Sequence, residues 1–257
     1  MKNNSVCSKI KMWFCNLLFP ENIKCIFCGV DIANFEEKPF CEDCEKKISF
    51  NNKNKCIICA EPIDNEAIVC DVCQKKKRFF KRAFCPFVYD GIVRNSILGF
   101  KDSNRRYLAK TFAKYIVKEI VDSKIDIDLI TFVPMTKKKT RARSFNQSKL
   151  LAEEVAKLLN LPMVALFEKT KDAKAQKFLT SQERIDAIEG LYVFNQTKLN
   201  LDDNVLIVDD IITTGSTINY CAKLIEGKVK GVFACAIARN KKRTSTSNIA
   251  KEKQSKK

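Results

Sequence analysis

Four cysteine pairs with the spacing Cys-x-x-Cys occupy the first third of the chain and constrain its fold more than any other feature. A gap of two residues lets both thiolates of a pair bind one zinc ion at about 2.3 Å, and two pairs complete a tetrahedral set. A disulfide framework is the alternative, but no secretory signal precedes the pairs and a reducing compartment opposes disulfides. The spacing therefore predicts two structural Zn2+ sites. The predicted ligands are Cys25, Cys28, Cys41, Cys44, Cys56, Cys59, Cys70 and Cys73.

Stretches of 12, 11 and 10 residues separate the pairs, which leaves their partnership open. The first pair can join the second, giving two zinc ribbons in series, or it can join the third in a crossed arrangement. Because zinc binding supplies folding free energy to small domains, we expect chelation to unfold residues 20–75 and leave the rest folded. The other cysteines lack this spacing, and most are expected to be small buried apolar residues. They are Cys7, Cys15, Cys85, Cys221 and Cys235.

The 257 residues carry a formal charge of +17 and no histidine. The absence of histidine excludes Ser-His-Asp triads and HExxH zinc proteases, so any chemistry depends on carboxylates, amines, hydroxyls, thiols or a metal. The positive charge favours acidic partners such as nucleic acid or phosphorylated small molecules. A hydrophobic content of 46% is that of a globular chain, long enough for one large or two modest domains.

The apolar stretch over residues 12–19 is too short to cross about 30 Å of hydrocarbon, and we expect an amphipathic helix there that covers the zinc ribbons. No membrane insertion is predicted, and the cytoplasm is the expected location. A basic run, Lys75–Arg82, follows the last cysteine pair and contains Phe79 and Phe80. It is either a surface on which single-stranded DNA stacks its bases or a linker whose rings pack on the next domain.

Composition changes at this run, so we predict three parts: an N-terminal helix with a double zinc ribbon over 1–82, an α/β domain over 83–240, and a basic disordered tail over 241–257. In the second part, apolar strands alternate with helices. Two helices are each predicted to place four apolar residues on one face: Leu108, Phe112, Ile116 and Ile120, then Leu151, Val155, Leu158 and Leu159. The expected strands are AFCPFVYDG, DLITFVP, MVALF, GLYVF, NVLIVDD and GVFACAIA. This alternation predicts a parallel sheet with helices on both faces and ligands beyond the carboxyl ends of its strands.

The stretch VLIVDDIITTGST, Val205–Thr217, occupies such a position. A buried central strand is predicted over 205–208, with Asp209 and Asp210 at its carboxyl edge. Gly215 permits a tight turn among hydroxyl side chains, before a helix over about 217–226 that Gly227 caps. N–H groups at a helix start suit a phosphate, while the acids suit ribose hydroxyls or a magnesium-bound ligand. The stretch therefore predicts a site for a sugar phosphate.

The same stretch resembles the phosphoribosyl pyrophosphate (PRPP) binding motif of type I phosphoribosyltransferases. The order of motifs along the chain is similar to that of the ComF competence family. The motifs are the cysteine pairs, YDGIVRNSILGFKDSNRR (Tyr89–Arg106), VPMTKKKTRARSFNQSKLLAEEVA (Val133–Ala156), a segment with Gln176, Leu179 and Arg184, and the PRPP motif. The resemblance implies that the domain over 83–240 is α/β and phosphoribosyltransferase-like.

The resemblance also implies roles for individual residues. Asp209 and Asp210, the candidate catalytic residues, would face the ribose hydroxyls of PRPP, which binds with Mg2+. The implied phosphate loop is Thr213, Thr214, Gly215, Ser216 and Thr217, and the implied pyrophosphate ligands are Lys137, Lys138, Arg141 and Arg143. The chain departs from the family at Ser144, where Gly is usual, and at Ala175, where Pro is common. Both departures are expected to affect catalytic turnover more than ligand binding.

Three functions are consistent with these features. The first is a cytoplasmic ComF-type competence protein that binds PRPP and handles incoming single-stranded DNA with a ComF-type helicase partner. The second is an active magnesium-dependent phosphoribosyltransferase with a nucleobase-like acceptor. The third is a zinc-ribbon interaction module on an inactive transferase fold. The ordered set of family motifs favours the first.

Overall fold

The computed structural model describes residues 24–32, 39–63, 66–102, 105–170, 190–195 and 199–241. Several predictions lie outside the described residues: the N-terminal helix with Cys7 and Cys15, the segment with Gln176, and the basic tail. None of the described helices is long and apolar enough to cross a membrane.

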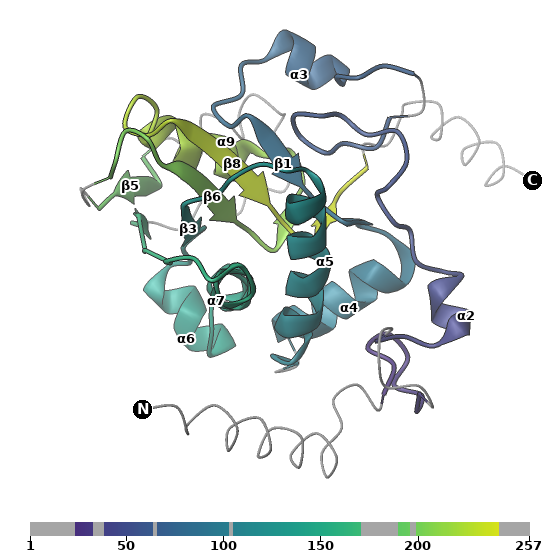
Figure 1. Ribbon diagram of the computed structural model, residues 1–257. Helices are drawn as coiled ribbons and strands as arrows, with labels where there is room; N and C mark the ends of the chain where they lie inside the picture. Colours follow the sequence, from purple (N-terminus) through teal and green to yellow (C-terminus); the bar gives the residue numbers. More distant parts are fainter. Residues whose placement is uncertain are drawn as a thin grey trace, which may run out of the picture.

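The centre of the fold is a four-stranded parallel sheet in the order β1-β8-β6-β3 (Figure 1). Its strands are β1 (Arg82–Phe84), β8 (Gly231–Cys235), β6 (Asn204–Val208) and β3 (Leu129–Phe132). Strand β6 lies between two neighbours, and its residues from Val205 to Val208 are fully buried. The predicted central strand is therefore confirmed.

Three of these strands break and continue as a second parallel sheet in the order β2-β9-β7. Its strands are β2 (Phe87–Val88), β9 (Ala238–Arg239) and β7 (Ile211–Ile212). The strand register puts the three breaks at one level, after Phe84, Cys235 and Val208. Asp209 and Asp210 therefore lie inside a break, between β6 and β7, and not beyond the last strand residue. The predicted strand AFCPFVYDG is in fact two short strands, because Pro86 has no N–H to donate at the break.

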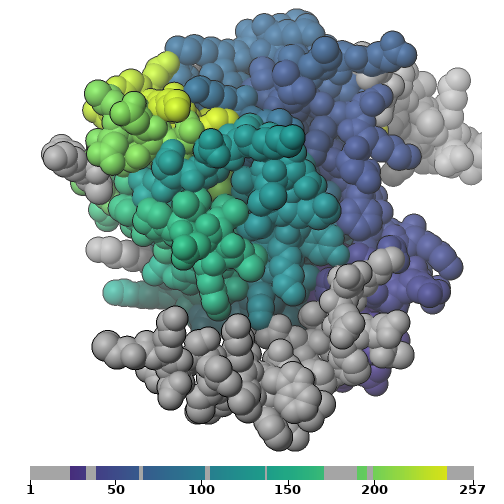
Figure 2. All heavy atoms as spheres, viewed as in Figure 1, coloured from purple at the N-terminus to yellow at the C-terminus, as the bar shows by residue number. Residues whose placement is uncertain are grey.

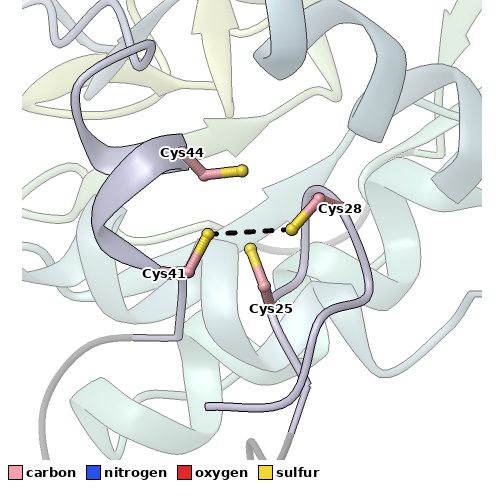
Figure 3. A group of neighbouring side chains, drawn as sticks. All are labelled: Cys25, Cys28, Cys41 and Cys44. Carbon is pink, nitrogen blue, oxygen red and sulfur yellow. Dashed lines mark hydrogen bonds between the residues drawn. The ribbon is translucent and has the colours of Figure 1, made fainter.

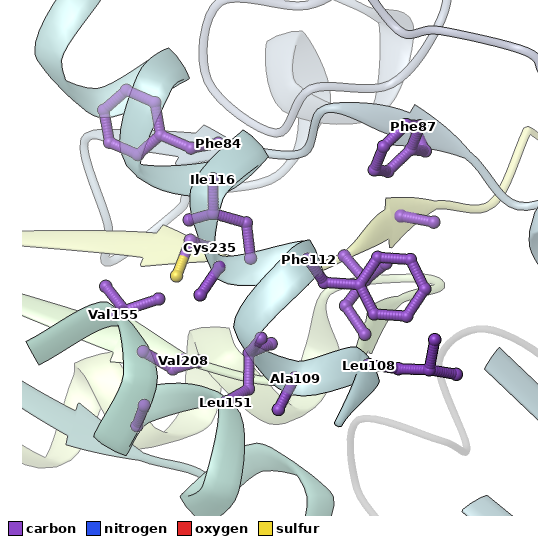
Figure 4. Close-up of a cluster of buried hydrophobic side chains, with 14 of the residues drawn as sticks. Phe84, Phe87, Leu108, Ala109, Phe112, Ile116, Leu151, Val155, Val208 and Cys235 are labelled. Atoms are coloured by element: carbon purple, nitrogen blue, oxygen red, sulfur yellow. The ribbon is translucent and has the colours of Figure 1, made fainter. Parts of the chain in front are cut away.

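Helices cover both faces of the sheet, as predicted. On one face, α4 (Gly91–Asp102), α5 (Leu108–Asp122) and α7 (Gln147–Leu159) pack against the side chains of Leu206 and Val208 (Figure 4). On the other face, α9 (Ser216–Leu224) packs against Val205 and Ile207. Successive residues of β6 thus point to opposite cores, which explains why the strand is a continuous apolar run.

The predicted apolar face of α5 is confirmed, since all four of its residues are buried. On α7, Leu151 and Val155 are buried, but Leu158 is 41% exposed and the prediction for it is wrong. Leu158 lies in the last helical turn, where Leu159 is the residue that packs against the core.

The predicted strand MVALF is also wrong. Met163 forms only an isolated bridge with Ile130, because the N–H of Leu166 donates to the side chain of Thr131 and not to a backbone carbonyl. The chain becomes a strand again at β4 (Phe167–Lys169), which pairs antiparallel with β5 (Tyr192–Phe194).

The cysteine-rich segment shares both hydrophobic cores with the α/β part. Cys25 and Cys44 belong to the cluster under α5, whereas Cys56 and Cys59 belong to the cluster under α9. Figure 2 shows the blue cysteine-rich residues packed directly against the teal residues of α5. The expectation that chelation would unfold residues 20–75 alone does not fit this packing.

Residues Ser49–Asn51 cover the outer edge of strand β2. Phe50 and Phe87 form an antiparallel bridge, Val88 N–H donates to Ser49 at 2.8 Å, and Asn51 N–H donates to Pro86 at 2.8 Å. The Asn51 side chain also donates to the carbonyls of Ala60 and Cys85. The cysteine-rich segment is therefore hydrogen-bonded to the sheet.

Phe80 decides between the two interpretations of the basic run. Its side chain is 2% exposed and lies in the core under α9, while Phe79 is partly buried and packs against the same core. Phe79 N–H also donates to the Asn219 side chain at 2.9 Å. The rings pack on the next domain, so stacking of DNA bases on Phe80 is excluded.

Candidate functional site

The first cysteine tetrad brings together Cys25, Cys28, Cys41 and Cys44. The first two lie in a tight turn, and the other two lie at the start of α2 (Glu42–Glu45) (Figure 3). Their sulfur atoms are all within 4.8 Å of one another, and those of Cys28 and Cys41 are 3.7 Å apart. Four sulfurs bound tetrahedrally to zinc at about 2.3 Å are about 3.8 Å apart, so this donor set fits Zn2+.

The second tetrad joins Cys56, Cys59, Cys70 and Cys73, with the last two at the start of α3 (Asp71–Lys75). The sulfurs of Cys59 and Cys70 are 3.6 Å apart. Hydrogen bonds within the tetrad lower the pKa of Cys56 and raise the pKa of Cys59. Each pair thus joins its neighbour in sequence, and the crossed arrangement is excluded.

The carboxylates of Asp209 and Asp210 are held by two other elements. Ser148 at the start of α7 donates from Oγ to Asp209 Oδ1 at 2.8 Å, and the Asp210 N–H donates to the same oxygen at 2.9 Å. Lys101 at the end of α4 pairs its Nζ with Asp210 Oδ2 at 2.8 Å. Burial and the adjacent negative charge of Asp210 raise the pKa of Asp209 to about 7. One acid of the pair therefore changes charge close to neutral pH.

The loop after β7 leads directly into α9. Gly215 occupies the residue before the helix with φ of 74°, a left-handed conformation that favours glycine. The hydroxyl oxygens of Thr214 and Ser216 are 2.7 Å apart, and the N–H of Ser216 donates to the Thr214 hydroxyl. The loop thus gathers hydroxyls at the N-terminus of a nine-residue helix, where an anion is stabilised.

The basic segment forms the short helix α6 (Lys137–Arg143) after strand β3. The side chains of Lys138, Arg141 and Arg143 are exposed, and Arg141 lines a shallow cavity of about 430 Å3. Their assignment to pyrophosphate stays a prediction. Ser144 ends the helix with φ of 66°, so the usual glycine of the resembling family is replaced at a position that favours glycine.

Comparison with protein-family models finds both halves of this architecture. A double zinc ribbon domain matches residues 14–74, and a phosphoribosyl transferase domain matches residues 146–255. The two tetrads are therefore the structural zinc sites of a double zinc ribbon, and the sheet with the Asp209 loop belongs to a phosphoribosyltransferase-like domain.

Curated relatives match across both domains. Competence protein F of Haemophilus influenzae is 25% identical over 211 residues, which cover 79% of this chain and 91% of the relative. Competence protein ComFC of Bacillus subtilis is 21% identical, covering 79% of this chain and 85% of the relative. Across both of its domains, the chain is similar to the ComF competence proteins. The DNA utilization protein YhgH of Escherichia coli is 25% identical, covering 78% of this chain and 89% of the relative.

Solved structures that resemble this chain are more distant. A glutamine PRPP amidotransferase from Bacillus subtilis, complexed with ADP and GMP, has a TM-score of 0.37 and 17% identity, covering 54% of this chain and 30% of that one. Adenine phosphoribosyltransferase from Saccharomyces cerevisiae has a TM-score of 0.35 and 18% identity, covering 55% of this chain and 71% of that one.

Sequence reasoning missed two residues that hold the acids of this site, Lys101 and Ser148. Both lie in the segments that carry the family resemblance, FKDSNRR and FNQSK. Gln147 connects them, since its buried side chain donates to the Lys101 carbonyl at 3.2 Å. A lysine at a helix end and a serine at a helix start are common, so only the packing of α4 against α7 identifies them.

Proposed function

We propose that this protein is a ComF-type competence protein that acts in the cytoplasm on incoming single-stranded DNA and binds PRPP with Mg2+. The observation that carries PRPP binding is the juxtaposition of a carboxylate pair with a loop of hydroxyl and N–H donors at a helix start. The competence role is supported by the relatives, which are named competence and DNA utilization proteins.

In this proposal the loop from Thr213 to Thr217 holds the 5′-phosphate through backbone N–H groups and hydroxyls. Asp209 and Asp210 accept hydrogen bonds from the two ribose hydroxyls, while Lys101 and Ser148 fix the orientation of the acids. The exposed basic residues of α6 face the pyrophosphate. When bound, Mg2+ supplies further neutralisation of the pyrophosphate charge.

The test is a calorimetric titration of the full chain with magnesium and PRPP between pH 6 and pH 8. A group with a pKa of about 7 rises from about one tenth to about nine tenths ionised over this range, so we expect affinity to rise about tenfold. The direction follows because only the ionised carboxylate of Asp209 accepts both the Ser148 and the ribose hydroxyl. The charged groups facing Asp209 are Asp210 and, beyond it, Lys101.

The control is Asp209→Asn, which should keep only the pH dependence of the ligand's own phosphate, whose pKa is about 6. An equal pH dependence in the variant would contradict the assignment. Product analysis of the same samples with added nucleobases distinguishes a PRPP-binding protein from an active transferase.

A separate groove supports the DNA part of the proposal. A cavity of about 680 Å3 lies between the first zinc ribbon and α5, with Lys24, Lys110 and Lys114 on its walls. Tyr107 is 62% exposed at this groove, and Arg106 lies with its guanidinium 4.7 Å from the Phe145 ring centroid. Cations that follow a phosphate backbone beside an exposed ring suit single-stranded nucleic acid.

We expect Tyr107→Ala to weaken single-stranded DNA binding by about 5- to 150-fold, corresponding to the loss of about 1 to 3 kcal/mol of stacking on one base. The melting temperature should stay the same, because the ring is exposed. Fluorescence anisotropy at several salt concentrations measures the effect, and affinity should fall as salt rises. Val121→Ala, an exposed change at the other end of α5, is the control. Wild-type DNA affinity in Tyr107→Ala would exclude this groove.

A further inference from the structure

Arg239 on strand β9 connects the second tetrad with the loop that follows β7. Its side chain is 2% exposed, and its Nε donates to the Cys59 carbonyl at 2.9 Å. One terminal nitrogen donates to the Ile212 carbonyl at 3.0 Å. The other lies 3.9 Å from the Cys59 sulfur and is paired with the Glu61 carboxylate. A single buried guanidinium therefore contacts the zinc site and the last residue of β7, directly before the loop.

Arg78 makes a second connection, closer to the anion-binding residues. Its Nε donates to the Cys73 sulfur at 3.5 Å, and a terminal nitrogen donates to the Thr214 carbonyl at 3.2 Å. Its other terminal nitrogen would lie 3.3 Å from a Cβ atom at Gly215. Arg78 is thus packed against the left-handed glycine that directly precedes α9.

The charge of the metal site explains why arginines occupy these positions. Zinc with four thiolates carries a net charge of about −2, so its sulfurs are strong acceptors for charged donors. Two different sulfurs, those of Cys59 and Cys73, each receive one guanidinium. Within the described residues, no arginine donates to a sulfur of the first tetrad. The link to the loop is therefore a property of the second tetrad.

We propose that Arg78 and Arg239 are positioning residues through which the metal in the second tetrad fixes the conformation of the phosphate loop. The proposal rests on the proposed function of that loop as a PRPP site. The Cys73 sulfur is the acceptor that holds Arg78 against the Thr214 carbonyl, so loss of the metal that fixes this sulfur would release Arg78 as well. Arg239 keeps Glu61 as a partner, so Arg78 is the residue on which the loop depends more strongly.

Hydrogen exchange of the full zinc-loaded chain tests this inference without any ligand. In Arg78→Ala, the amides of Ser216 and Asn219, which donate to Thr214 and Gly215, should exchange about tenfold faster. Amides of α5 should keep wild-type rates, and metal analysis should still find two zinc ions. Lys77→Ala is the matched control, because it removes a neighbouring exposed cation that pairs with Glu226, and not with Cys73 or Thr214, and lies over the Phe79 ring.

Arg78→Lys keeps the charge but lacks the planar guanidinium whose two nitrogens reach Cys73 and Thr214 separately, so its loop should exchange as in Arg78→Ala. Cys73→Ser should also release the loop, and adding Arg78→Ala to it should have no further effect. Unchanged loop exchange in Arg78→Ala, or equal acceleration in α5, would overturn the inference.

A PRPP titration completes the experiment. We expect Arg78→Ala to bind PRPP about tenfold more weakly than the wild type, and Lys77→Ala to bind it equally well. A wild-type protein that does not bind PRPP would refute the proposed function. A wild-type protein that binds it, with Arg78→Ala unaffected, would refute only the positioning role.

Discussion

Replacing Asp209 and Asp210 together with asparagine is expected to weaken PRPP binding by about 10^2- to 10^4-fold. Each acid would lose a charge-assisted hydrogen bond to a ribose hydroxyl, worth about 1.5 to 3 kcal/mol. The direction of the change in affinity is informative, because removing two negative charges near an anionic ligand would by itself strengthen binding. Weaker binding therefore requires direct contact between the acids and the ligand.

The double variant should keep its fold. Asparagine still offers an oxygen to Ser148, and the two causes that raise the pKa of Asp209, burial of its charge and repulsion from Asp210, both disappear. A raised carboxyl pKa reduces stability as pH rises from about 4 to about 7, so above pH 7 the variant should melt at a temperature equal to or higher than the wild type. Calorimetric titration and thermal melting of the same samples measure both effects.

A second acidic pair provides a matched control. This pair is Asp202 and Asp203, which lie directly before β6, whereas Asp209 and Asp210 lie directly after it. Changing Asp202 and Asp203 to asparagine removes the same amount of charge at the opposite end of the strand. This control should bind PRPP like the wild type. An unchanged dissociation constant in the Asp209 and Asp210 variant, or an equal loss in the control, would contradict the assignment.

Removing zinc is expected to destabilise the whole chain, with an effect larger than that of any single substitution. Metal binding contributes about 10 to 16 kcal/mol to zinc-finger peptides, as much as the total stability of a typical domain. Each tetrad contributes buried cysteines to one of the two cores, so chelation should lower the melting temperature of the sheet and of α5 as well as of the ribbons. Circular dichroism and hydrogen exchange, with and without chelator, measure this.

The control for cysteine chemistry is Cys221→Ala. Cys221 is fully buried on α9 and outside both tetrads, so its loss should cost only about 1 to 2 kcal/mol and leave two zinc ions bound. Metal analysis of the wild type that finds well under one zinc per chain would refute the zinc sites. A sheet that melts at an unchanged temperature after chelation would refute the shared cores.

Local sequence patterns predicted the structure correctly where the pattern lies within a single helix or strand. The apolar run at Val205–Val208 predicts a strand buried on both faces, and the four-residue spacing from Leu108 predicts the buried face of α5. The cysteine spacing predicts two metal sites but not which pairs combine, because spacing within a pair says nothing about the path of the chain between pairs. The structure brings adjacent pairs together.

Other features depend on contacts between segments far apart in sequence. Arg78 and Phe80 lie in a basic run that is typical of a solvated surface, yet one contacts Cys73 and Thr214 and the other is in the core. Arg239 follows the last long strand, and nothing in the sequence around it predicts its hydrogen bond to Cys59, 180 residues earlier. The sequence does not predict the break between β6 and β7 either, because Ile211 and Ile212 continue the apolar pattern of the strand.

The cover of strand β2 by Ser49–Asn51 has a consequence for solubility. An uncovered edge strand presents free N–H and C=O groups that another chain can pair with, and this is a common route to aggregation. A shortened chain beginning at residue 83 would expose the Val88 N–H and the Pro86 carbonyl, together with the apolar ring of Phe87. With Ser49–Asn51 in place, the outer edge of strand β2 is already hydrogen-bonded, so it cannot pair with the same edge of a second copy of the chain.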